Sequence, residues 1–289
     1  MEQRLKFAFL KMKGYRLKWS SLLLLSGLFS CGTPKVILED QSVPDKNQII
    51  VSTAVTDQLG NLYYAKYSNE IIKEDPTGKQ IGYFSNNQLG QIGAIDATSP
   101  LKVLVFYPAF NTGVVLDRRL LETGRFSLIE MGFGEIDLVS FSRDGALWIF
   151  DDHEQRLFKV NQQGEILRKG DDLRLVFNER LQPSRLIEAG ENLYLGVPGR
   201  GLLLFDLFGQ YKSQMLYPEL RDFQIINDES MVFEKEGTLM VVQMMNLQEQ
   251  HFELRPEMQK GRMLLTKQQL IQITSDEIIR WPTADLMGN

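Results

Sequence analysis

A pattern of four short apolar segments separated by tight turns recurs about every forty residues, and it constrains the fold more than any other feature. The clearest copy spans residues 135–170. Its four segments cover residues 136–141, 147–150, 157–160 and 165–168, and polar turns such as Asp144-Gly145 separate them. Four short strands joined by tight turns form one antiparallel sheet.

One apolar pair, at the start of the second segment, can be aligned in six copies. The pairs are Leu62-Tyr63, Val103-Leu104, Leu147-Trp148, Leu193-Tyr194, Met231-Val232 and Leu270-Ile271. A single sheet cannot bury both of its faces, whereas sheets placed around an axis cover one another and expose only short edges. The sequence therefore predicts an all-β fold, a six-bladed β-propeller of four-stranded antiparallel blades over residues 48–289.

A turn glycine precedes the fourth segment in several copies. Gly78, Gly164 and Gly209 lie 16, 17 and 16 residues after the first anchor residue of their copies. Gly124 lies 21 residues after its anchor, which predicts a longer hairpin in the second copy, and the fifth copy lacks the glycine.

The last copy has too few residues for a fourth strand, since only seven follow Pro282. We expect residues 35–39 to supply it and to close the ring, with residues 49–56 as the innermost strand of the first blade. The alternative is that residues 36–38 merely begin a linker. Closure would leave an edge-free ring.

The segment from Asp144 to Asp151 resembles the central motif of NHL-like and gluconolactonase-like six-bladed propellers. The resemblance is clear in this copy and degenerate in the other five. It supports the fold and says little about activity. Gluconolactonase-like propellers bind a divalent ion in the channel through acids and an asparagine of their innermost strands. Here Asp57, Asp96 and Glu188 lie at unmatched offsets, so no ligand set is carried over.

The first thirty residues have the pattern of an export signal. They hold six basic residues against one acid and an apolar run over residues 19–29. Eleven helical residues reach roughly 16 Å, too short for about 30 Å of hydrocarbon. A basic region followed by a short apolar run is typical of a helical signal peptide, over residues 1–30. Translation from Met12 would also leave such a signal, and a buried helix is the alternative.

Cys31 is the sole cysteine and directly follows this run. The segment Leu28-Phe29-Ser30-Cys31-Gly32 resembles a bacterial lipobox, although Phe29 is larger than is usual there. The resemblance implies acyl chains such as palmitate on Cys31 and a lipid-anchored N-terminus over residues 31–47. Gly32, in place of an aspartate, favours the outer membrane. The alternative is an ordinary secretory signal with an incidental cysteine.

The remaining chain is acidic. Residues 31–289 carry a formal net charge of −10. Such a surface repels phosphate backbones, so nucleic acid is not an expected partner.

Motifs for catalysis are sparse. His153 and His251 are the only histidines, neither lies in a serine-hydrolase context, and no G-x-S-x-G occurs. The acids at 151–154 and the methionines near residue 244 are better explained by a solvated turn and by core packing. The sequence therefore predicts no catalytic residue, cofactor or metal ligand.

Aromatic and basic side chains expected in loops are the candidate partner contacts, with burial against a neighbouring blade as the alternative for the aromatic residues and a solvated turn as the alternative for Arg200. They are Phe106, Tyr107, Phe110, Arg200 and Trp281. Aromatic residues and arginine are enriched at binding hot spots. The sequence favours an outer-membrane lipoprotein that scaffolds another envelope protein, with the membrane bound through Cys31 and the body facing the periplasm. The alternatives are a metal-dependent, lactonase-like hydrolase working in the propeller channel and a ligand- or carbohydrate-binding module.

Overall fold

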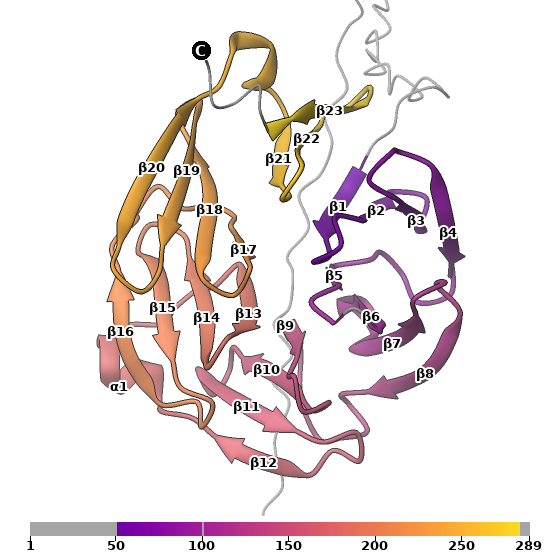
Figure 1. Cartoon of the computed structure of the whole chain (residues 1–289). Helices are drawn as coiled ribbons and strands as arrows, with labels where there is room; N and C mark the ends of the chain where they lie inside the picture. Colours follow the sequence, from indigo (N-terminus) through magenta and orange to yellow (C-terminus); the bar gives the residue numbers. More distant parts are fainter. Residues whose placement is uncertain (1–50, 100, 284–289) are drawn as a thin grey trace, which may run out of the picture. The chain divides into compact units, whose positions relative to one another are not determined.

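The computed structural model describes residues 51–99 and 101–283 and shows six antiparallel sheets arranged as blades around a central axis (Figure 1). Blade 1 comprises β1 (Val51–Thr56), β2 (Leu62–Lys66), β3 (Glu70–Glu74) and β4 (Gln80–Ser85). Blade 2 comprises β5 (Ala94–Asp96), β6 (Lys102–Tyr107), β7 (Thr112–Asp117) and β8 (Glu122–Ser127). Blade 3 comprises β9 (Ile136–Phe141), β10 (Leu147–Asp151), β11 (Arg156–Val160) and β12 (Ile166–Lys169).

The second half of the ring repeats this arrangement. Blade 4 comprises β13 (Arg185–Ala189), β14 (Asn192–Val197), β15 (Gly201–Phe205) and β16 (Tyr211–Met215). Blade 5 comprises β17 (Gln224–Ile226), β18 (Ser230–Lys235), β19 (Thr238–Gln243) and β20 (Gln248–Glu253). Blade 6 comprises β21 (Arg262–Leu265), β22 (Gln269–Ile273) and β23 (Ile278–Pro282). The prediction of an all-β six-bladed propeller is confirmed.

Short helical segments occur only in connections of the described part. They are α1 (Leu173–Phe177), η1 (Pro108–Phe110) and η2 (Pro256–Met258). None of the helices in the described residues is long and apolar enough to cross a bilayer. The predicted signal peptide, the acylated Cys31 and the closing strand at residues 35–39 lie outside the described residues.

The six anchor pairs all lie on the second strand of a blade, where both sheet faces are covered. Each blade packs against the next through its own apolar cluster; Trp148 of β10, for example, packs with Leu203 and Phe205 of β15. Leu62 of β2 and Ile271 of β22 share a further cluster that joins the last blade to the first. Burial between neighbouring blades, about 25 cal/mol per Å² of apolar surface, therefore holds the ring together.

Polar contacts reinforce the junction between blades 6 and 1. Arg280 of β23 forms an ion pair with Glu74 of β3 at 2.5 Å. The Gln269 side-chain amide donates to the carbonyl of Pro76 at 3.1 Å. Side-chain packing and polar contacts among the described residues thus join blade 6 to blade 1.

The turns before the fourth strands differ from expectation in two blades. Gly78, Gly164 and Gly209 adopt left-handed conformations at these turns, as their spacing suggests. Gly124 does not, because it lies within β8. Its expected place is taken by Leu120, with φ of 65°, and in blade 5 by Leu247, with φ of 56°. The predicted longer hairpin in the second copy is therefore wrong: Leu120 keeps the 17-residue spacing from Val103.

The strand order gives the ring two distinct faces. The innermost strands of the blades, beginning with β1 and ending with β21, all start at one face, which we call the entry face. They end at the other, which we call the exit face. Turns between second and third strands, and the connections between blades, lie at the entry face. Turns between first and second strands lie at the exit face.

Candidate functional site

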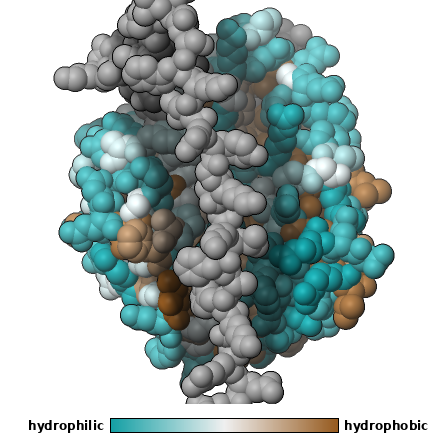
Figure 2. Space-filling view, turned by 180° about the vertical axis from the view of Figure 1, so that it is seen from behind, coloured by the Kyte–Doolittle hydropathy of each residue, from teal (hydrophilic) through white to brown (hydrophobic). Residues whose placement is uncertain are grey.

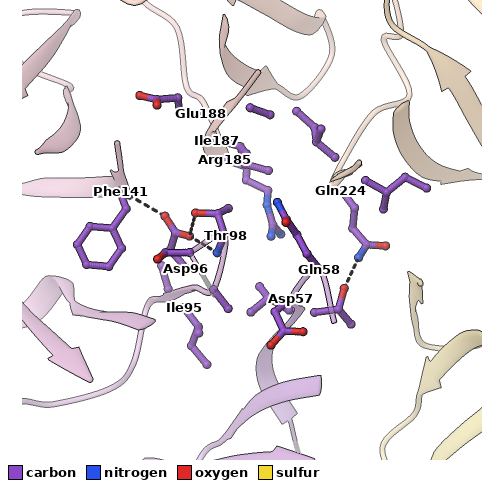
Figure 3. Close-up of a pocket in the computed structure, with 18 of the residues that line it drawn as sticks. Asp57, Gln58, Ile95, Asp96, Thr98, Phe141, Arg185, Ile187, Glu188 and Gln224 are labelled. Carbon is purple, nitrogen blue, oxygen red and sulfur yellow. Dashed lines mark hydrogen bonds between the residues drawn. The ribbon is translucent and has the colours of Figure 1, made fainter. Parts of the chain in front are cut away.

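A central channel of about 870 Å³ runs between the innermost strands of the six blades. Its wall comes from all six blades, and Figure 3 shows side chains from several of them pointing inward. A cavity of this volume falls within the size range of small-molecule sites. The channel is therefore the candidate functional site.

Charge is distributed unevenly along this channel. At the entry face the charged lining residues are Arg185, Arg221, Asp222 and Arg262. At the exit face they are Asp57, Asp96, Lys102, Arg143, Glu188, Asp228 and Lys267. Apolar side chains such as Val55, Val139 and Ile187 line the wall between the two ends. The formal charge of the lining is thus +2 at the entry face and −1 at the exit face.

Asp57 and Asp96 are tied to the backbone and side chains around them. Asp57 accepts hydrogen bonds from the Asn61 side chain at 2.7 Å and the Tyr63 hydroxyl at 3.0 Å, as well as from two backbone amides of its own turn. Burial and this carboxylate raise the pKa of Tyr63 well above its ordinary value. Asp96 accepts from the Phe141 amide at 2.7 Å, which links blade 2 to blade 3.

Glu188 is buried, and both of its oxygens accept hydrogen bonds from blade 3. Its carboxylate accepts from the Trp148 indole at 2.5 Å, the Ser142 hydroxyl at 2.6 Å and the Arg143 amide at 2.9 Å. Three donors compensate for removing one carboxylate from water. Its place in the channel wall is therefore structural, as is that of Asp57 and Asp96.

Gln224 connects three blades across one side of the channel. Its amide nitrogen donates to the Thr56 hydroxyl at 3.1 Å (Figure 3), and its carbonyl oxygen accepts from the Leu265 amide at 2.7 Å. Polar residues at the ends of the innermost strands thus fasten the blades where the sheets come closest.

The entry end of the channel contains two guanidinium groups on one carboxylate. Arg185 donates a hydrogen bond of 2.9 Å to the carboxylate of Asp222, and Arg262 forms an ion pair with the same carboxylate at 2.6 Å. Burial alone would raise the pKa of Asp222, but the two arginines hold it below its usual value. Burial lowers the pKa of Arg262; Asp222 opposes this effect, and the charge of Arg185 adds to it.

Of the predicted partner contacts, Phe106 and Tyr107 are not surface residues. Both belong to β6, are 0% exposed, and pack in the clusters between blades 2 and 3 and between blades 1 and 2. The exposed loop starts only at η1, so the prediction that Phe106 and Tyr107 are exposed partner contacts is wrong. Successive side chains of a strand point to opposite faces of its sheet, so Phe106 packs against blade 3 and Tyr107 against blade 1.

The other three candidates are at least partly accessible. Phe110 is 51% exposed in η1 at the entry face. Arg200, in the turn between β14 and β15, is half-buried; it pairs with Glu179 and lies over the Phe177 ring at 4.8 Å. Trp281 on β23 is half-buried and donates to the Gln272 side chain at 3.1 Å. Phe110 and Arg200 thus share one face, while Trp281 lies toward the other.

The histidines and the acidic turn lie away from the channel wall. His153 is exposed between β10 and β11, and His251 is exposed on the outermost strand of blade 5. In the acidic turn Asp152 pairs with Arg180 and Glu154 with Lys169. The described residues contain no group of three or more His, Cys, Asp or Glu side chains placed to hold a metal ion.

The arginines at the entry end were missed by sequence reasoning. Arg185 and Arg262 are each the first residue of an innermost strand, in blades 4 and 6. An alignment of the six copies at their first strands, in addition to their second strands, would have placed Arg185 and Arg262 at the same position of the repeat. Their convergence on Asp222 comes from the closed ring.

Comparison with known proteins supports the architecture. The chain is similar to a streptogramin B lyase structure, with 14% identity, a TM-score of 0.53 and coverage of 83% of this chain and 84% of that one. A virginiamycin B lyase from Staphylococcus aureus, in a catalytically inactive variant with quinupristin, gives 12% identity, a TM-score of 0.53 and coverage of 83% and 86%. At such identities the similarity shows a shared fold. The chain is, by fold and by its channel, a six-bladed β-propeller protein.

More distant matches share the propeller architecture loosely. BamB from Moraxella catarrhalis gives 11% identity, a TM-score of 0.41 and coverage of 79% of this chain and 71% of that one, which supports no shared function. No protein-family model matches the chain, and no curated protein matches it.

Proposed function

We propose that this protein is a lipid-anchored, non-enzymatic binding propeller of the bacterial cell envelope, held to the outer membrane through Cys31 and contacting another envelope protein. The observation that carries the choice of binding over hydrolysis is the state of the channel acids. Asp57, Asp96 and Glu188 have their oxygens committed to protein donors.

A lactonase-like reaction would need those oxygens for a divalent ion. Carboxylates that ligate calcium or magnesium must turn free lone pairs toward the ion. Withdrawing Glu188 from the Trp148 indole, the Ser142 hydroxyl and the Arg143 amide would leave three donors unpaired, two of them on residues that are themselves buried. The cost, at about 1–3 kcal/mol for each buried donor, opposes metal binding at this position.

A lyase reaction is not favoured either. The inactive variant of the S. aureus lyase is named for replacement of a histidine by alanine. Both histidines of the present chain are exposed and absent from the channel wall. General acid–base chemistry by histidine requires the imidazole within hydrogen-bond reach of the substrate.

Binding through the entry face is consistent with the exposed apolar residues there. Tyr67, Phe110, Ile129, Leu175 and Leu216 are all more than half exposed and lie in turns or connections at that face. Figure 2 shows apolar residues as separate patches on a mostly hydrophilic surface. Separate anchors within a polar surface are typical of a non-obligate protein interface.

Site-specific photocrosslinking in cells tests this proposal. A photoreactive amino acid at position 110 is expected to give one discrete crosslinked species in the membrane fraction, identified by mass spectrometry. The matched control is position 59, because Leu59 is 70% exposed at the exit face. Crosslinking that is equal at both positions, or absent from both with the protein recovered as a monodisperse monomer, would contradict the proposal.

A further inference from the structure

The entry end of the channel combines three features that a mere structural ion pair does not need. Two guanidinium groups share one carboxylate, a third arginine lines the same end, and the whole group faces a cavity of about 870 Å³. Figure 3 shows the Arg185 side chain extending into the space between the blades.

The charges at this end do not cancel. Arg185 and Arg262 together carry two positive charges, and Asp222 returns one. Arg221 is exposed and adds another at the same end. The acids Asp57, Asp96, Glu188 and Asp228 lie at the exit face, across the apolar middle of the channel. An anion at the entry end would therefore meet uncompensated positive charge in a partly enclosed place, where electrostatic interactions are stronger than in water.

Hydrogen-bonding capacity is also left over. The Nε atom of Arg262 has no hydrogen-bond partner among the described residues but is itself buried, so the donors open to a ligand are the remaining Nη hydrogens of Arg185 and Arg262, each of which places one nitrogen against Asp222. A guanidinium presents its donors in a planar fork that matches carboxylate and phosphate oxygens. The side chains of Arg185 and Arg262 are only 21% and 28% exposed, so their orientation is fixed by packing before any ligand arrives.

From these observations we propose that the entry end of the channel is a binding site for a small organic anion, one whose carboxylate or phosphate group contacts Arg185 and Arg262. The apolar residues deeper in the channel, such as Val139 and Ile187, contact the uncharged part of the same molecule. Asp222 acts as an internal competitor that holds the two guanidinium groups in place and limits affinity for the ligand anion. This inference is independent of the proposed protein-binding function.

Replacing Asp222 tests the inference, because an anion site predicts tighter binding in the variant. Asp222→Asn keeps an oxygen acceptor for the Phe223 amide, which Asp222 binds at 2.9 Å, but removes the competing charge. If the site binds anions, this variant binds them about tenfold more tightly than the natural protein, since 1.4 kcal/mol of relieved competition equals a factor of ten. If the arginines serve only the ion pair, the variant is destabilised and shows no gain in anion binding.

The experiment is isothermal titration calorimetry of the folded protein with two probes, succinate and inorganic phosphate, at constant ionic strength. We expect saturable binding of at least one probe, a loss of about tenfold or more in Arg185→Gln and Arg262→Gln, and a gain in Asp222→Asn. Succinate in preference to phosphate would identify a carboxylate ligand, and the reverse a phosphate ligand. Arg119→Gln is the matched control, because Arg119 is exposed in the β7–β8 turn, away from the channel wall.

Besides the absence of a gain in Asp222→Asn, two results would overturn the inference. One is the absence of saturable binding of either probe to both the natural protein and Asp222→Asn. The other is binding that Arg185→Gln leaves unchanged. Arg185→Lys, which keeps the charge and removes the planar fork, covers the case in which a glutamine variant does not fold; it too must weaken binding.

Discussion

The indole of Trp148 on β10 donates a hydrogen bond of 2.5 Å to the carboxylate of Glu188 on β13, joining blade 3 to blade 4 at the channel wall. Trp148 also lies within the apolar cluster between these blades. This residue pair therefore holds blades 3 and 4 together and keeps the Glu188 carboxylate hydrogen-bonded within the channel wall. The pair explains why a conspicuous channel acid is not free for chemistry.

Replacing Glu188 tests this structural role. Glu188→Ala leaves the Trp148 indole, the Ser142 hydroxyl and the Arg143 amide without their acceptor. We expect the free energy of unfolding to fall by about 3 kcal/mol. Glu191→Ala, at an exposed position in the following turn, should change it by less than about 0.5 kcal/mol. Chemical denaturation measures both changes in the free energy of unfolding, and equal changes would contradict a structural role for Glu188.

The left-handed turn residue of blade 5 can be improved. Leu247 adopts φ of 56° and is 53% exposed. Leu247→Gly relieves a backbone conformation that is unfavourable for a side chain, so we expect a stabilisation of about 0.5–1 kcal/mol. Leu121→Gly, at an exposed position without a positive φ, should instead destabilise by a similar amount. Thermal unfolding of the two variants measures the change in stability, and a change in the same direction for both would contradict this explanation.

Acid should weaken the entry end of the channel. Arg185 and Arg262 hold the pKa of Asp222 below its usual value of 3.8, against the effect of burial. A depressed carboxyl pKa contributes stability that is present above the unfolded-state value and is lost as the pH falls through the folded-state value. We therefore expect stability to decrease below about pH 4, and Asp222→Asn to show a shallower decrease. Denaturation midpoints between pH 6 and pH 3 measure the difference; parallel curves would exclude this contribution.

Acylation of Cys31 remains a prediction from the sequence. In a bacterial host, Cys31→Ser should abolish the mass added by acyl chains and move the protein out of the membrane fraction. Gly32→Asp should leave acylation intact and reduce sorting to the outer membrane. Intact-mass spectrometry and membrane fractionation measure both. A natural protein without acyl groups on residue 31 would remove the membrane half of the proposed function.

Ring closure by residues 35–39 also remains a prediction. Ile37→Asp places a charge in the expected closing strand, where it should lower the free energy of unfolding by about 1–3 kcal/mol. Gln41→Asp, beyond that strand, is the matched control and should have little effect. If both variants unfold like the natural protein, the apolar cluster and the polar contacts between the blades, such as Arg280 with Glu74, hold blade 6 to blade 1 without a closing strand.

The sequence by itself determined the number of blades, the position of the second strands and most of the turns. These properties follow from local patterns: apolar alternation, spacing of about forty residues, and turn residues such as Gly78 and Gly164. Leu120 and Leu247 escaped prediction because a left-handed leucine carries no local signal. Phe106 and Tyr107 were misassigned because an aromatic run before proline looks alike on a buried strand and in an exposed loop.

Only the tertiary structure decided what the charged residues do. Asp57, Asp96 and Glu188 could each bind a ligand or hold the blades together, and the outcome depends on hydrogen-bond donors from residues 2 to 46 positions away in the chain. Arg185, Asp222 and Arg262 become one group only when three successive segments of the ring meet at the channel. The sequence gives the charge of each side chain. Whether two charges compensate each other depends on the distance between them, and across the channel this distance is set by the arrangement of the blades in the ring.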